Sequence, residues 1–168
     1  MSGTRVSETL RSELLGTAGL TVAVIVATGL TYSRRLEAGH LRAGNARATF
    51  IALIALQALH FTEEYAAGFH ERFPAFLGLA PWPATFFVPF NVIWLGIWVG
   101  AALGLRAGYQ LALFPAWFLA IASVANGIAH PVLALATRGY FPGLWTSPLL
   151  AAGGMLLWRR LMTITARA

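Results

Sequence analysis

Five stretches of the chain are apolar for about 20 residues each, and this pattern limits the possible folds more than any other feature. They cover residues 14–32, 48–69, 84–105, 110–137 and 144–162. A helix needs about 20 residues to cross the hydrocarbon core of a bilayer, which is roughly 30 Å thick. The sequence therefore predicts an all-α fold, a single polytopic membrane bundle of about five transmembrane helices that takes up residues 1–168.

The composition excludes several other classes of protein. Apolar residues make up 58% of the chain and charged residues 11%, which leaves too little polar surface for a soluble domain of this length. The chain has no cysteine, so it can form neither a disulfide nor a thiolate metal site. No glycine-rich phosphate loop follows a strand, and we therefore expect no nucleotide cofactor.

All 12 basic residues are arginines, and they lie mainly at the edges of the apolar stretches. This placement indicates contact with lipid headgroups and cytoplasmic loops rather than with nucleic acid, although the net charge is +6. Eight of them fall on one side of the predicted bundle: Arg34, Arg35, Arg42, Arg47, Arg106, Arg159, Arg160 and Arg167. The positive-inside rule then predicts a bacterial-type plasma (inner) membrane protein with its N-terminus outside and its C-terminus in the cytoplasm.

Gly96, Gly100 and Gly104 recur every four residues along the third stretch, and Gly108 continues the series. Such a row of small residues lets a second helix approach closely. We favour packing inside the bundle as its role, and a homo-oligomer formed through the same glycines is the alternative.

The second stretch carries three ionisable residues, His60, Glu63 and Glu64, at positions i, i+3 and i+4. Residues at this spacing project from one face of a helix. Charged groups inside a membrane are costly and are usually functional, so this face is the first candidate for a site.

Further polar residues are expected at the same depth. Successive helices alternate in direction, so the end of the second and fourth helices and the start of the third and fifth lie on the same side. The residues that can meet there are His60, Glu63, Glu64, Asn91, Asn126, His130, Tyr140 and Thr146.

Three motifs follow one another in this part of the chain: His60-x-x-Glu63-Glu64, Asn126-x-x-x-His130 and Tyr140-x-Pro142-Gly143-x-x-Thr146. In this order they resemble the HxxEE-motif integral membrane proteins. The resemblance implies that these positions are the family's signature residues, and it implies no particular reaction.

From these residues we predict a membrane-embedded enzyme that acts on a lipid or isoprenoid-type substrate. Adjacent carboxylates in a low-dielectric pocket do not both ionise easily, so the pair can hold a proton for acid–base chemistry. The predicted catalytic residues are His60, Glu63, Glu64, Asn126, His130 and Tyr140. The predicted substrate cavity is lined by Gln57, Asn91, Trp94, Trp145 and Thr146.

Three alternatives to metal-free catalysis stay open. In the first, His60, Glu64 and His130 bind one divalent metal ion for hydrolytic or oxygen chemistry, since His and Glu one helical turn apart are common ligands in helical bundles. In the second, the cluster binds or transports an ion, a proton or a small ligand without catalysis. In the third, it is a structural hydrogen-bond network. Metal-free chemistry is favoured because Glu63 and Glu64 point about 100° apart and cannot easily share one ion.

Overall fold

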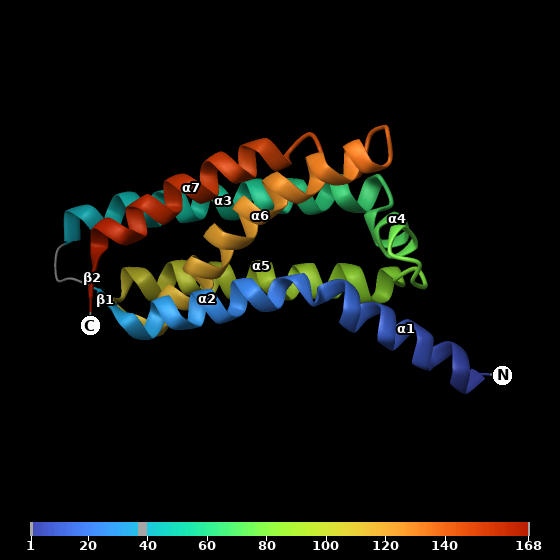
Figure 1. Ribbon diagram of the computed structural model, residues 1–168. Helices are drawn as coiled ribbons and strands as arrows, with labels where there is room; N and C mark the ends of the chain where they lie inside the picture. The colour runs from blue at the N-terminus through green and yellow to red at the C-terminus, as the bar shows by residue number, and fades with distance from the viewer. Residues whose placement is uncertain (1, 37–39, 168) are drawn as a thin grey trace.

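The computed structural model describes residues 2–36 and 40–167, most of which are helical (Figure 1). The helices are α1 (Ser2–Thr17), α2 (Gly19–Ser33), α3 (His40–Ala66), α4 (Phe69–Phe76), α5 (Ala84–Arg106), the short 3-10 helix η1 (Gln110–Ala112), α6 (Leu113–Ala136) and α7 (Ser147–Ile164). Two short strands, β1 (Arg34–Leu36) and β2 (Thr165–Arg167), pair with each other. The predicted all-α bundle is confirmed.

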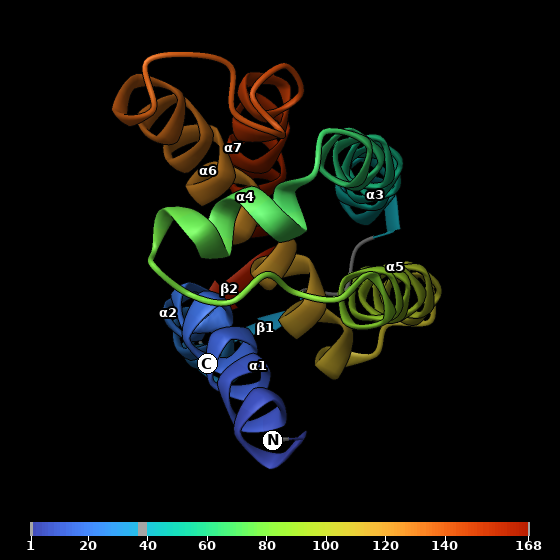
Figure 2. The ribbon, with the colours of Figure 1, turned by 90° about the vertical axis from the view of Figure 1, so that its right-hand side faces the viewer.

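The long helices form two layers that α6 connects. In Figure 1, α3 and α7 run together along one side, α2 and α5 along the other, and α6 crosses obliquely between them. The most extensive packing joins α6 to α7, followed by α3 to α7, α2 to α6 and α3 to α5. The short helix α4 lies across one end of the bundle (Figure 2). We call this end the α4 end, and the opposite end, where β1 and β2 pair, the clip end.

The clip end ties α2 to the C-terminal segment. The strands pair antiparallel, with Arg34 opposite Arg167 and Leu36 opposite Thr165. Gln110 reinforces this junction, because its Nε2 donates to the carbonyl oxygens of Thr31 (2.9 Å) and Arg34 (2.5 Å) and its Oε1 accepts from the backbone N–H of Leu36 (3.1 Å).

Small residues bring α6 and α7 close together. A Cβ added at Gly154 would lie 2.7 Å from the carbonyl oxygen of Ala120, and one added at Gly127 would lie 3.0 Å from that of Ser147. The backbones therefore approach more closely than larger side chains would allow. This contact fixes the second half of α6 against the start of α7, where the candidate site lies.

Within residues 2–36 and 40–167, two helical segments are long and apolar enough to cross a membrane, namely Ala84–Arg106 and Gln110–Ala136. A third is added if Ser7–Thr17 and Gly19–Ser33, bent by 47° at their junction, are taken as one span. These segments indicate a membrane protein. The helices α3 and α7 do not meet the same criterion, because polar site residues interrupt α3 and Arg159 and Arg160 lie within α7. The count of five crossings stays a prediction.

The first predicted helix, residues 14–32, is wrong in its boundaries, since the structure has α1 and α2 with a break between Thr17 and Gly19. The indole of Trp82 occupies the space beside Gly16, and a Cβ there would overlap it. The hydroxyl of Ser12 also donates to the carbonyl oxygen of Ala80 (2.5 Å). The loop before α5 therefore packs against the bend.

The second and fifth predicted helices also differ from the observed ones. The helix predicted at 48–69 begins at His40 and ends at Ala66, because Gly68 takes the left-handed conformation (φ +75°) that ends α3 and starts α4. The helix predicted at 144–162 begins only at Ser147. The preceding residues form a turn that belongs to the candidate site.

The glycine row on α5 does not pack inside the bundle as favoured from the sequence. A Cβ added at Gly96 or Gly100 would meet no atom of the described chain within 4 Å, and both residues are exposed. The opposite face of α5 is the buried one, with Phe87, Asn91 and Trp98. Gly104 alone approaches a neighbour, since a Cβ there would lie 3.0 Å from that of Ala112. A homo-oligomer formed through these glycines stays a prediction.

Candidate metal centre

Three segments that are distant in sequence meet at the α4 end of the bundle. The last turns of α3 carry His60, Glu63 and Glu64, and the last turns of α6 carry His130. The turn of residues 140–146 connects α6 to α7 and lies between them. The structure thus brings together the signature positions of all three sequence motifs.

Glu63 holds the 140–146 turn in place. Its Oε1 accepts hydrogen bonds from the Tyr140 hydroxyl (2.8 Å) and the Trp145 backbone N–H (3.0 Å). Its Oε2 accepts from the backbone N–H (3.0 Å) and the hydroxyl (2.6 Å) of Thr146. A carboxylate that accepts four hydrogen bonds acts as an ionised acceptor. Glu63 is therefore a positioning residue that binds the turn.

The Thr146 hydroxyl links Glu63 to His60 and orients the imidazole. Its only hydrogen is given to Glu63, so its oxygen accepts from Nδ1 of His60, 2.6 Å away. Nδ1 of His60 therefore carries a proton, so in the neutral ring its Nε2 carries a lone pair. His60 is fully buried, and Nε2 has no hydrogen-bond partner in the part of the chain that the structure describes.

His130 is oriented in the same way by a different group. Its Nδ1 lies 2.6 Å from the carbonyl oxygen of Pro142, which can only accept, so Nδ1 carries the proton here too. Gly143 makes this approach possible. Its φ is +88°, and an added Cβ would lie 2.6 Å from Nδ1 of His130 and 2.8 Å from Cε1 of His60.

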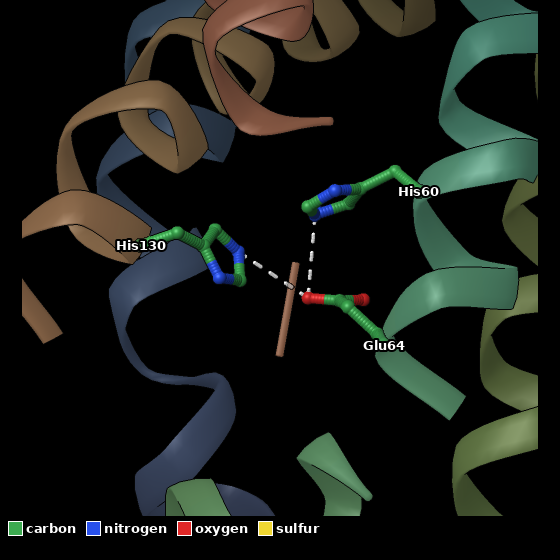
Figure 3. A group of neighbouring side chains, drawn as sticks. All are labelled: His60, Glu64 and His130. Atoms are coloured by element: carbon green, nitrogen blue, oxygen red, sulfur yellow. Dashed lines mark ion pairs between the residues drawn. The ribbon is translucent and has the colours of Figure 1, made fainter. Parts of the chain in front are cut away.

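Both imidazoles present Nε2 to one oxygen of Glu64 (Figure 3). Oε1 of Glu64 lies 3.3 Å from Nε2 of His60 and 3.4 Å from Nε2 of His130. The side chains are 0%, 7% and 3% exposed for His60, Glu64 and His130. Three buried electron-pair donors thus point at one another: the two Nε2 atoms and Oε1 of Glu64. None of the three carries a hydrogen in the neutral tautomers selected by the hydrogen bonds of the two Nδ1 atoms.

These separations match the spacing of metal ligands. Zinc binds imidazole nitrogen and carboxylate oxygen at about 2.0–2.2 Å, and the edges of such a tetrahedron are about 3.3 Å long. Two edges of the cluster have this length, and the ligand atoms that the three residues offer all lie within 4.8 Å of one another. The contacts of the two Nδ1 atoms are the outer hydrogen bonds that fix ligating histidines in metal sites.

The comparison with known proteins agrees with the placement of the motifs. Residues 51–156 match the family described as "Protein of unknown function with HXXEE motif", and this stretch contains the three motifs. The chain belongs to this family. No curated protein and no solved structure matches it. The geometry gives the two carboxylates of the HXXEE motif different roles, because Glu63 holds the turn and Glu64 faces the histidines.

A cavity of about 270 Å³ opens beside this cluster of the HXXEE chain. Glu64 and His130 line it, and so do four other residues predicted from the sequence to belong to the site: Gln57, Asn91, Trp94 and Asn126. Asn126 is half-buried and its amide makes no hydrogen bond to the described residues. His60 lies behind Glu64 and does not line the cavity.

Five of the predicted site residues do not line the cavity, namely His60, Glu63, Tyr140, Trp145 and Thr146. The predicted placement of Trp145 and Thr146 in the substrate cavity is therefore corrected. Trp145 is 74% exposed and stacks on Tyr140 at the surface. Thr146 and Tyr140 both bind Glu63 instead of facing the cavity. The turn points their side chains outward or toward α3, which the spacing of the motif could not reveal.

Sequence reasoning missed most of the aromatic lining. Phe69 and Phe73 come from α4, Phe87 and Trp98 from α5, and Trp82 from the loop between them. Phe69 also lies against the His130 ring, with centroids 5.6 Å apart. The only available signal was the spacing of Trp98 one helical turn after Trp94, which places both on the same face of α5.

Tyr140 lies outside the helices, and its ionisation should report on the turn. Partial burial, together with the hydrogen bond to Glu63, raises the pKa of Tyr140 to about 12. Because the folded state binds this proton more tightly than the unfolded chain, the stabilisation is complete below about pH 10 and is lost as the pH rises through about 12. In a titration of tyrosinate absorbance, one tyrosine should ionise late, and Tyr140→Phe should remove that step.

The matched control is Tyr109→Phe, since Tyr109 is 67% exposed at the clip end. The late step should persist in this variant. Loss of the late step in Tyr109→Phe, or its persistence in Tyr140→Phe, would contradict the hydrogen bond between Tyr140 and Glu63.

Proposed function

We propose that the chain is a membrane metalloenzyme that hydrolyses a hydrophobic ester or amide. In this proposal His60, Glu64 and His130 bind one divalent cation, which activates the attacking water. The observation that supports the proposal is the meeting of two imidazole lone pairs and one carboxylate oxygen in a buried site. Two histidines and one glutamate, with a further position open to water, form the ligand set of many hydrolytic zinc enzymes.

A cation accounts for this geometry better than a shared proton, which was the interpretation favoured from the sequence. One proton can bridge Glu64 to only one of the two imidazoles, and the other Nε2 would keep a lone pair directed at the same oxygen. Protonating both rings would place two positive charges beside one carboxylate in a buried pocket, which is costly. A single cation satisfies all three donors at once.

The divergence of Glu63 and Glu64 does not weigh against a metal here. It would if both carboxylates had to bind the same ion, but the third ligand comes from α6 as His130. Glu63 instead fixes His60 through Thr146. Such outer partners typically contribute about 10–100-fold to metal affinity.

The chemistry would follow from water bound to the cation beside the cavity. Metal coordination lowers the pKa of water to about 7, so hydroxide is available at neutral pH. A cation held by His60, Glu64 and His130 would supply hydroxide for attack on an acyl carbon, with cleavage of the bond to the leaving oxygen or nitrogen and transfer of the proton released by the water to that leaving atom. Asn126 lies in the cavity with a free amide and can donate to the carbonyl oxygen as negative charge develops there.

We further propose the orientation predicted from the arginines, with the site facing outward from the plasma membrane. The clip end, remote from the site, carries Arg34, Arg35 and Arg167 on the paired strands and Arg106 at the end of α5. Such a concentration of arginine favours the cytoplasmic side. The metal centre would then lie toward the outer leaflet.

Metal content tests the proposal directly. Protein purified in detergent without chelator should contain about one equivalent of a divalent metal by plasma mass spectrometry. In His60→Ala and Glu64→Gln the content should fall at least about tenfold, while circular dichroism remains that of a helical bundle. Glu71→Gln is the control, because the Glu71 side chain is 67% exposed outside the cluster.

Activity provides the second arm of this test. Hydrolysis of a fluorogenic long-chain ester by protein in lipid nanodiscs should stop on chelation and return with zinc. Metal-free wild-type protein whose activity is unaffected by chelator would overturn the proposal in favour of acid–base catalysis. Stoichiometric iron together with oxygen consumption would replace hydrolysis by oxygen chemistry.

A further inference from the structure

The cavity beside the metal centre extends toward the lipid phase. Its walls come from α2, α3, α5 and α6, and Phe69 and Phe73 of α4 also line it. A second, more open hollow of about 240 Å³ adjoins it and is bounded by Leu20 and Val24 on α2 and by Phe90 and Trp94 on α5. Leu20, Phe90 and Trp94 line both spaces, so the two lie side by side. We call the second space the α2–α5 groove.

The inner part of the cavity is built for a polar group. Oε1 of Gln57 and Nε1 of Trp98 are buried, and neither has a hydrogen-bond partner in the described parts of the chain. Gln57 is 2% exposed and Trp98 3% exposed, and both face the cavity. Buried donors and acceptors without partners are rare in folded proteins and indicate a missing ligand or water. Together with the free amide of Asn126, they surround the approach to Glu64.

The α2–α5 groove is built for an apolar chain. Its lining is mostly apolar, with Leu20, Val24, Phe90, Trp94 and Phe118 beside Thr17 and Thr21. Phe118 precedes His130 by 12 positions on the same helix, which is about 18 Å along its axis. Phe118 and His130 therefore lie about the length of an extended hydrocarbon chain apart, and both line the cavity.

The flanking helices leave this groove open. α2 packs chiefly against α6, and α5 packs chiefly against α3 and α6. Exposed apolar side chains, including Val22 and Ile25 on α2 and Val92 and Ile93 on α5, surround the two helices. A molecule dissolved in the bilayer could therefore enter sideways between α2 and α5.

We infer that the substrate is a single-chain acyl amphiphile, whose acyl group lies at the metal centre and whose alkyl chain occupies the α2–α5 groove. This inference rests on the proposed function, because the cation is what holds the acyl group beside Glu64 and His130. The unpaired Gln57 and Trp98 atoms hydrogen-bond to the polar group, and the groove selects for chain length.

The experiment uses an alkyl hydroxamate with a diazirine near the end of a hexadecanoyl chain, added to protein in lipid nanodiscs. A hydroxamate binds zinc through two oxygens. After irradiation, peptide mass spectrometry should find the label on α2 and α5, at Leu20, Val24 or Phe90. Excess unlabelled hexadecanoyl hydroxamate should reduce this labelling at least tenfold, and Glu64→Gln should reduce it similarly.

Two results separate the inference from the proposed function. If the matching primary amide, which does not chelate, labels the groove as strongly as the hydroxamate, the groove holds the chain but the metal proposal fails. If acetohydroxamate inhibits the enzyme but the long probe labels only exposed surfaces outside both spaces, such as Val132 and Leu135 on α6, the metal proposal stands and the inference is overturned.

A blocking variant gives an independent test. Val24→Trp should fill the groove and weaken competition by hexadecanoyl hydroxamate at least tenfold, while acetohydroxamate inhibition stays unchanged and shows that the site is intact. Val22→Trp is the matched control, since Val22 is 65% exposed on the same helix and lines neither space. If hexadecanoyl hydroxamate competes equally well in wild type, Val24→Trp and Val22→Trp, the inference is overturned.

Discussion

Replacing Gly143 with alanine is expected to abolish metal binding and to destabilise the fold. The new Cβ would lie 2.6 Å from Nδ1 of His130 and 2.8 Å from Cε1 of His60, and both rings are held by hydrogen bonds that prevent them from moving aside. The φ of +88° adds a backbone cost for any residue with a Cβ. Overpacking and the left-handed backbone together should lower the free energy of unfolding by about 2–5 kcal/mol.

Gly139→Ala is the control for this variant. Gly139 lies in the same connection between α6 and α7, and a Cβ there would meet no atom of residues 2–36 and 40–167 within 4 Å. Metal content by plasma mass spectrometry and the midpoint of thermal unfolding should both stay near wild type in Gly139→Ala. Stoichiometric metal in Gly143→Ala would show that the two histidines do not meet as described.

Glu63→Gln is expected to weaken the fold and the metal site together, whereas Glu64→Gln should affect the metal site alone. Four donors converge on the Glu63 carboxylate, and a glutamine can accept with only one oxygen. At least one donor would then face an amide N–H. Hydrogen bonds to a charged group are worth about 1.5–3 kcal/mol each, and the partial exposure of Glu63 reduces the expected loss to about 2 kcal/mol in total.

Metal affinity should change to different extents in the two variants. Glu63→Gln frees the Thr146 hydroxyl to donate elsewhere and loosens His60, so metal affinity should fall about 10–100-fold without vanishing. Glu64→Gln removes a ligand, so the metal should be lost while the midpoint of thermal unfolding of the apo protein stays close to wild type. Zinc titration and thermal unfolding of both variants would check this contrast. Identical behaviour of the two variants would contradict the separate roles of Glu63 and Glu64.

The meeting of the motifs was predictable because it depends only on the alternation of helix direction. His60 and Glu64 lie near the end of one long helix and His130 near the end of another, so any bundle in which those ends point the same way brings them close. The separate roles of the two carboxylates were not predictable. They depend on the path of residues 140–146, where Gly143 and the Pro142 carbonyl place a turn that no periodicity describes.

The errors in the fold come from tertiary contacts. Residues 14–32 are apolar enough for one helix, but the bend at Thr17–Gly19 depends on Trp82, which is distant in sequence. The glycine row on α5 resembles a packing surface, yet larger aromatic side chains on the other face of α5 form the buried contact. In both cases a tertiary contact made by a tryptophan or phenylalanine decided between conformations that the local sequence leaves open.

Helix α2 is held near both of its ends, because the loop of Ala80 and Trp82 packs against the bend that precedes it and the clip end holds its other end. Gln110 and the β1–β2 pair hold it at Thr31 and Arg34, and the side chains that face the groove further along, at Leu20 and Val24, are apolar. Lipid tails are as apolar as these side chains, so a small outward displacement of the middle of α2 exchanges one apolar contact for another. The gap beside α2 can therefore widen for a bulky tail at little energetic cost, while the histidines at the α4 end, held by Thr146 and Pro142, stay still.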